Sequence, residues 1–190
     1  MDIFPYKTQF HLLRHFSEID ASYRERIKTA MSLSDKDIDK QLSISGSKFF
    51  SDFAKNPLEL WERILHHNDF NIHQIEQLKG KTEIKLLFSE KEFPHGIAND
   101  SLLELDEIPA DQIKMVERHK RDGFMVQQIR FDYHKPSWQL NIVLINSDQP
   151  YILTIFPGIY APPLPHPERQ NKEAYNKNKH FWNKHVLNTF

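Results

Sequence analysis

Cysteine is absent from all 190 residues of the sequence. Its absence excludes disulfide scaffolds, thiolate metal sites and cysteine nucleophiles, and it fits a reducing compartment. Glycine is also scarce, with five residues, and no glycine-rich turn stands before a predicted helix. A phosphate-binding loop of the nucleotide-binding kind is therefore not expected. The Gly-x-Ser-x-Gly elbow of serine hydrolases is missing as well.

Long hydrophobic runs are missing too. The longest, residues 140–145, is interrupted by Asn141 and is far shorter than the roughly 20 residues that cross a bilayer. The first residues show no basic segment followed by an apolar one, so we expect no secretory signal. These absences predict a cytoplasmic chain that has no membrane partner.

The sequence has no large excess of charge of either sign, since its net charge is −1. This argues against a generally basic nucleic-acid binder. The charge is unevenly distributed, however: residues 90–111 contain seven acids and one base, whereas residues 113–135 contain six bases and three acids. A chain that is neutral overall can still present an acidic or a basic face.

The residues that are present suit a packed core. Hydrophobic residues make up 39% of the chain, with 14 Phe and 3 Trp, and charged residues make up 27%. This composition and length predict one domain over residues 1–190. We expect residues 1–80 to be helical, and residues 81–190 to form an antiparallel sheet with a C-terminal helix.

Helical periodicity marks the first part of the chain. Apolar residues at intervals of three and four predict a helix over residues 7–31, and weaker patterns predict short helices over residues 32–41 and 69–79. Within residues 51–70, Asn56 before Pro57 is a typical helix start, with a capping side chain followed by proline at the first helical position. A final helix is expected over residues 168–186.

After Gly80 the period changes to that of strands. Four strands are predicted, over residues 82–88, 124–131, 137–145 and 151–156. Because short links join the last three, we expect an antiparallel meander, and the fold class is α+β. Residues 89–111 are predicted to be a long loop, and the proline-rich residues 161–167 to be extended.

Metal chemistry is the first function to test, because the chain has 11 His. No His-Glu-x-x-His motif is present, and the adjacent His66 and His67 would point roughly 100° apart on a helix. We therefore expect no metal and no cofactor.

Metal-free RNA cleavage is the second. It needs a general base, a general acid and donors for the phosphate oxyanion. His95, in a tight Pro-His-Gly loop, is the best acid–base candidate, with His134 and Lys135 as alternatives. Thr154 and Tyr160 stand on either side of the turn at residues 156–158, where their hydroxyl groups could hold a phosphate.

Cations for the same phosphate could come from Lys85 and Arg130, on two predicted strands. Catalysis by this set requires His95, Thr154 and a cation to converge within hydrogen-bonding reach of one substrate.

A family resemblance supports this hypothesis. Helices followed by a four-stranded antiparallel sheet resemble the barnase/EndoU/colicin/RelE-like (BECR) ribonuclease superfamily. Residues 151–158, Tyr-Ile-Leu-Thr-Ile-Phe-Pro-Gly, are similar to a last-strand motif of many bacterial polymorphic toxin domains, in which a hydroxyl residue precedes an aromatic-Pro-Gly turn. The resemblance covers about residues 81–160.

The resemblance implies a metal-independent endoribonuclease of bacterial toxin type. Thr154 would contact phosphate, His95 would be acid or base, and Tyr160 would assist them. One branch of the superfamily uses a pair of histidines, of which the sequence identifies only His95.

The alternative is a non-enzymatic protein-binding module of immunity, antitoxin or regulatory type. The acidic loop 90–111, with Glu104, Asp106 and Glu107, would then be the binding surface, because acidic surfaces mimic RNA. The two hypotheses imply different partners, RNA in the first case and a protein in the second.

Overall fold

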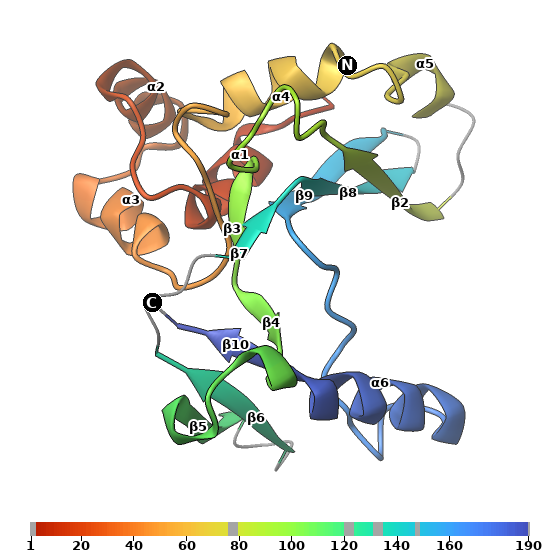
Figure 1. Cartoon of the computed structure of the whole chain (residues 1–190). Helices are drawn as coiled ribbons and strands as arrows, with labels where there is room; N and C mark the ends of the chain where they lie inside the picture. The colour runs from red at the N-terminus through yellow and green to blue at the C-terminus, as the bar shows by residue number, and fades with distance from the viewer. Residues whose placement is uncertain (1–2, 76–79, 120–123, 131–134, 147–148, 190) are drawn as a thin grey trace. The chain divides into compact units, whose positions relative to one another are not determined.

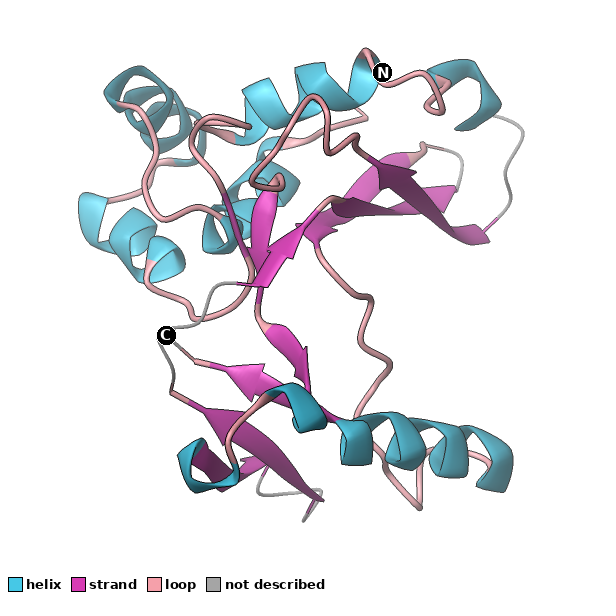
Figure 2. Ribbon diagram, in the orientation of Figure 1, coloured by secondary structure: helices cyan, strands magenta, loops and turns pink. Residues whose placement is uncertain are grey.

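The computed structural model is a mixed α+β structure with several antiparallel sheets (Figures 1 and 2). It describes residues 3–75, 80–119, 124–130, 135–146 and 149–189. The chain divides into two compact units: unit 1 is Met1–Asn99 with Pro136–Gly158, and unit 2 is Asp100–Lys135 with Ile159–Phe190.

Unit 1 holds most of the helices. They are α1 (Tyr6–Leu12), the 3-10 helix η1 (Leu13–His15), α2 (Ala21–Met31), α3 (Asp35–Leu42), α4 (Pro57–Leu65) and α5 (Ile72–Ile75). The helix predicted over residues 7–31 is in fact divided, because Asp20 starts a new helix by accepting a hydrogen bond from the Tyr23 amide. The helix start at Asn56 is confirmed, since its side chain accepts hydrogen bonds from the amides of Leu58 and Glu59.

The main sheet of unit 1 is three-stranded and antiparallel. Its strands are β2 (Gly80–Leu87), β8 (Gln139–Asn146) and β9 (Tyr151–Pro157), in the order β2-β8-β9. Leu86, Ile142 and Ile155 point from one face into the core. The opposite face carries Lys85 and Thr154. A smaller sheet has the order β1-β3-β7, formed by β1 (Lys48–Phe49), β3 (Ala98–Asp100) and β7 (Lys135–Ser137).

The core of unit 1 fills the space between the sheet and the helices. Phe16, Phe53 and Leu60 are among its fully buried members. The start of the chain is tied to the sheet, because Thr8 donates a hydrogen bond to the Ile152 carbonyl and the Ile152 amide donates one to Ile3. This packing fixes α1 along β9.

Unit 2 is built on a four-stranded mixed sheet with the order β4-β10-β6-β5. Its elements are β4 (Leu102–Glu104), η2 (Leu105–Glu107), η3 (Ala110–Gln112), β5 (Ile113–His119), β6 (Phe124–Ile129), α6 (Lys172–Lys184) and β10 (His185–Asn188). Strands β10 and β6 are parallel, and the other pairs are antiparallel. The indole N–H of Trp182 on α6 donates to the Pro162 carbonyl at 3.1 Å, which packs the proline-rich segment against the helix.

Three sequence predictions differ from this architecture. The predicted four-stranded antiparallel sheet is divided, because β6 pairs with β5 and β10 in unit 2 while the other three strands pair in unit 1. The predicted loop 89–111 contains β3, β4, η2 and the start of η3, since Ile97, Leu103 and Ile108 bury their side chains. The final helix ends at Lys184, because the following residues join the sheet as β10.

The helix predicted over residues 69–79 and the expected lack of a membrane span can also be compared with the structure. Part of the helix predicted over residues 69–79 is present as α5, and residues 76–79 lie outside the described residues. Among the helices that the structure describes, none is long and apolar enough to cross a membrane.

Candidate functional site

The five residues that the sequence predicts for catalysis belong to both units. Lys85, His95 and Thr154 are in unit 1, whereas Arg130 and Tyr160 are in unit 2. Both unit 2 residues are exposed. Within unit 1, the relevant geometry is the spacing of Lys85, His95 and Thr154.

Lys85 and Thr154 share the outer face of the unit 1 sheet. Lys85 lies opposite Asn141 on β8, and Thr154 lies opposite Val143 on the same strand. Since β8 separates their strands, their backbones are about 10 Å apart across the sheet. Between them the Asn141 side chain donates to the Gly158 carbonyl at 2.7 Å, which holds the turn after β9 against the sheet.

His95 is exposed and lies at another end of the unit. It precedes Gly96, whose φ is +86° and where a Cβ would stand 3.0 Å from the Ser137 carbonyl oxygen. His95 is therefore held beside β7. Six residues separate Ser137 from Val143, the partner of Thr154, which is roughly 20 Å of extended chain. The structure does not bring His95 and Thr154 together.

The two alternatives to His95 as acid or base are Lys135 and His134. Lys135 forms an ion pair with Glu107 at 3.0 Å. His134 lies outside the described residues.

The acidic residues of segment 90–111 are divided between the two units. Glu92 lies in unit 1, whereas Glu104, Asp106 and Glu107 lie in unit 2. Asp100 is buried and accepts hydrogen bonds from the amides of Leu102 and Ile159, so it holds the unit 2 backbone in place.

A large cavity opens in unit 1 at a place that the sequence did not single out. Its volume is about 980 Å³. Its walls are α4, the segment after α4, the end of β2 and the loop that follows β2. The charged and histidine side chains that line it are Asp52, Lys55, Glu59, Glu62, Arg63, His66, His67, Asp69 and Glu92.

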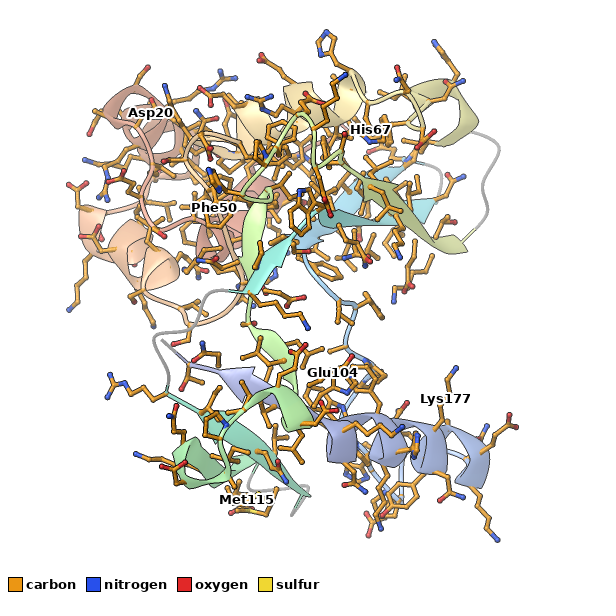
Figure 3. All side chains as sticks on the ribbon, viewed as in Figure 1. Asp20, Phe50, His67, Glu104, Met115 and Lys177 are labelled. Carbon is orange, nitrogen blue, oxygen red and sulfur yellow. The ribbon has the colours of Figure 1, made fainter. Side chains whose placement is uncertain are left out.

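Aromatic rings lie beneath this cavity. Phe53 and Phe88 meet edge to face at 4.9 Å, and Phe53 and Phe93 do so at 5.1 Å. The Arg63 guanidinium lies 5.4 Å above the Phe53 and Phe93 rings. The ring of His67, which Figure 3 labels, packs against Phe88 at 4.7 Å. Phe88 lines the cavity, and the buried Phe53 and Phe93 rings pack behind it as its floor.

The hydrogen bonds of His67 fix its tautomer. Its Nε2 lies 3.1 Å from the Leu87 carbonyl oxygen, which only accepts, so Nε2 carries the hydrogen. Its Nδ1 accepts from the Asp69 amide at 3.2 Å. The ring thus fastens the segment after α4 to the end of β2.

A second cavity of about 740 Å³ adjoins the first, because Ser51, Asp52 and Lys55 line both. Its other walls include Glu18, Asp20 and the rings of Phe16, Phe49 and Phe50. Figure 3 labels Asp20 and Phe50 in this region. We call the two cavities together the acidic groove.

The charge of the acidic groove is strongly one-sided. Seven carboxylates line it, against the two cations Lys55 and Arg63; the carboxylates are Glu18, Asp20, Asp52, Glu59, Glu62, Asp69 and Glu92. Within the described part of the chain, none of these nine groups forms an ion pair. No group of three or more His, Asp or Glu suited to holding a metal ion occurs among the described residues. The excess of carboxylates allows the groove to attract a cationic ligand.

A cluster of opposite charge lies elsewhere in unit 1. We call His11, Arg14, His15 and Lys48 the basic cluster. The Lys48 ammonium donates to three backbone carbonyls, those of Arg14 at 2.6 Å, Leu42 at 2.8 Å and Phe16 at 3.3 Å. Lys48 thus joins the ends of η1 and α3.

The charges of the basic cluster disfavour one another. Burial lowers the pKa of His15 to about 4, although its hydrogen bond to the Ser47 carbonyl acts the other way; Arg14, Lys48 and His11 lower it further. Burial and Arg14 lower the pKa of Lys48 to about 8. The pKa of His11 is lowered by burial and by Arg14.

The basic cluster lies next to the turn that carries the family resemblance. The His15 ring is 6.5 Å from the Phe156 ring and 6.4 Å from the Phe49 ring. The sequence predicted neither this cluster nor the groove as a functional site. The spacing of His11, Arg14 and His15 by three and four residues was the available signal for the cluster, whereas the groove residues come from distant segments and gave none.

No protein-family model matches the sequence, and comparisons with curated proteins and with solved structures give no match either. The geometry and the charges of these sites are therefore the observations that bear on the function.

Proposed function

We propose that this chain is a protein-binding module, and that the acidic groove takes up an extended, basic segment of a partner protein. The observation that carries the proposal is the groove's lining, in which seven carboxylates form no ion pair within the described residues and stand beside the half-buried Phe50 and Phe88. Opposite charge on a partner would steer it to the groove and select it against acidic competitors.

The shape of the groove supports an extended partner. Two adjoining cavities offer space along one path rather than a single deep pocket for a small molecule. Arginine or lysine side chains of the partner would meet Glu62, Asp69 and Glu92, and their methylene groups would pack on the apolar floor. Because aromatic packing and the His67 hydrogen bonds hold the walls, little ordering is needed on binding.

The test is peptide binding. A fluorescent octapeptide of alternating Arg and Leu is titrated with the full chain, beside an octapeptide of alternating Glu and Leu. The triple variant Glu62→Gln, Asp69→Asn, Glu92→Gln should weaken binding of the basic peptide by about tenfold or more, and added salt should weaken binding to the unaltered chain.

The matched control is the triple variant Glu104→Gln, Asp106→Asn, Asp111→Asn, which removes three exposed acids of unit 2. It should bind the basic peptide as the unaltered chain does. Equal weakening by both triple variants, or equal binding of the two peptides, would rule out the groove as the site.

RNA cleavage is the second candidate function. In its favour, the basic cluster adjoins Phe156, and Lys85 and Thr154 share the outer face of the same sheet. Against it, His95 and Thr154 are not close to one another. His95 lies beside Ser137, and roughly 20 Å of extended chain separates Ser137 from Val143, the partner of Thr154. Purified chain incubated with RNA in EDTA, beside His95→Ala and Thr154→Val variants, tests it. Cleavage that only the unaltered chain performs would support the ribonuclease hypothesis, and absence of cleavage would end it.

A further inference from the structure

The basic cluster contains three bases on one stretch of helix. His11 is the penultimate residue of α1, and Arg14 and His15 belong to η1. Residues three and four apart on a helix lie on the same side, so His11 stands beside both. Lys48 on β1 reaches the same place from another segment, as its hydrogen bond to the Arg14 carbonyl shows.

Two of the four groups already have their hydrogen bonds. The Lys48 ammonium has three donors and three carbonyl acceptors. His15 Nδ1 lies 3.0 Å from the Ser47 carbonyl oxygen, so Nδ1 carries the hydrogen and points away from any ligand. These two groups supply positive potential or structure rather than a free donor.

Arg14 is in the opposite situation. Its Nε is buried and has no hydrogen-bond partner among the described residues. Arg14 also forms no ion pair with any residue that the structure describes. Burial lowers the pKa of Arg14, and no carboxylate acts on the pKa of Arg14, His11, His15 or Lys48. A buried guanidinium N–H without an acceptor is costly, so an anion is the group that would complete this site.

We propose that Arg14 and His11 form a binding site for a phosphate group, with Arg14 supplying its planar guanidinium and His11 a second donor. An Arg guanidinium matches the oxygens of a phosphate in a two-donor geometry, which explains why a single arginine can organise the site. His11 is exposed, so the phosphate reaches the site from solvent. The phosphate belongs either to a free ion or small ester or to the backbone of a nucleic acid. This site is separate from the acidic groove and does not depend on what the groove binds.

The inner part of the cluster gives a direct readout. A phosphate beside Arg14 would add negative charge near His15, where Arg14 and Lys48 supply positive charge. Phosphate binding should therefore raise the pKa of His15 as well as that of His11. A merely structural cluster would not respond in this way.

The experiment follows the imidazole signals of His11 and His15 by NMR while inorganic phosphate is added at constant pH and constant ionic strength, with chloride as the balancing salt. Saturable shifts of both signals are expected. Arg14→Gln should weaken phosphate binding at least tenfold, whereas the matched control Arg169→Gln, at an exposed arginine of unit 2, should leave it unchanged.

Further arms distinguish the source of the phosphate and protect the test against misfolding. Ribose 5-phosphate and a dinucleotide are titrated in the same way; tighter binding of the dinucleotide identifies a nucleic-acid backbone, and tighter binding of the monoester identifies a small ester. If Arg14→Gln does not fold, the exposed His11→Gln replaces it and should also weaken binding. Shifts no larger than those in chloride, or shifts unaffected by a folded Arg14 or His11 variant, would overturn the proposal.

Discussion

The acidic groove and the basic cluster lie in the same unit and accommodate unbalanced charge in opposite ways. In the groove, carboxylates stand on the rim of cavities, where water solvates them, and the floor beneath is made of uncharged rings. In the basic cluster, the bases are partly buried; carbonyl oxygens accept hydrogen bonds from Lys48 and His15, while burial lowers the pKa values of both and so disfavours their charged forms.

This difference has a consequence for stability. The exposed Glu62, Asp69 and Glu92 of the groove can be neutralised with little effect on folding, because solvated groups contribute little to it, whereas Asp20 caps α2. The uncharged floor and the buried cluster cannot be changed so freely. Variants of the floor, the cluster, the α4 cap and the groove carboxylates should therefore differ in how much they lower the free energy of unfolding.

The largest effect is expected beneath the groove. Phe53 is 0% exposed, and its ring contacts those of Phe49, Phe88 and Phe93. Phe53→Ala would leave a cavity and should lower the free energy of unfolding by about 3–5 kcal/mol. Urea titration followed by fluorescence measures this, with Leu153→Ala at an exposed position as control. A loss as small as that of the control would show that the floor is not part of the core.

Acid should reveal the buried cluster. The pKa of His15 is about 4 in the folded chain and about 6.5 when unfolded, so between these values the unfolded chain binds the extra proton. The contribution of His15 is complete above pH 6.5 and is lost as the pH falls toward 4, by at most about 3 kcal/mol.

The measurement compares urea titrations at pH 7 and pH 5 for the unaltered chain and for His15→Gln. The variant should lose less stability between the two pH values than the unaltered chain does. An equal loss in both proteins would mean that His15 is not held neutral by the fold.

A smaller effect is expected at the start of α4, the helix that carries part of the groove's rim. Asn56 caps two backbone amides and donates to Asp20 at 2.7 Å. Asn56→Ala should cost about 1–2 kcal/mol, whereas Asn56→Asp, which keeps the cap acceptor, should show how much of that loss comes from the cap. If thermal unfolding gives the same value for Asn56→Ala and the unaltered chain, the capping interaction does not stabilise α4.

The smallest effect is expected for the rim charges themselves. Glu62→Gln and Asp69→Asn, both exposed, should change the free energy of unfolding by no more than about 0.5 kcal/mol each. The same urea titrations measure it. A larger loss would break the contrast, because the groove's carboxylates would then be structural and the peptide-binding test would need other variants.

The sequence could predict the elements whose signals are local. Asn56 and Pro57 marked the start of α4 correctly, because a cap acts within one turn of chain. Alternating apolar residues predicted β2 and β9, and a nearly continuous apolar run predicted β8, which is buried on both faces. The proline-rich residues 161–167 form neither helix nor strand, because proline removes the donors that a helix or a sheet requires.

The candidate site could not be predicted in the same way. Local patterns placed His95, Thr154 and Lys85 on plausible elements, but not at distances from one another, since distances depend on strand pairing between remote segments. The same limit led to the prediction of a single four-stranded sheet, because β6 has the pattern of a strand and no mark of its partner.

By itself, then, the sequence determined the positions of α4 and of strands β2, β6, β8 and β9, that thiol chemistry is excluded and that the chain is nearly neutral. The tertiary structure alone decided that β6 pairs with β10, that seven carboxylates gather around one groove and that Arg14 and His15 share a cluster with Lys48. The physical reason is range: caps and periodicity act over a few residues, whereas pairing, burial and the summed potential of charges depend on chain segments that only folding brings together.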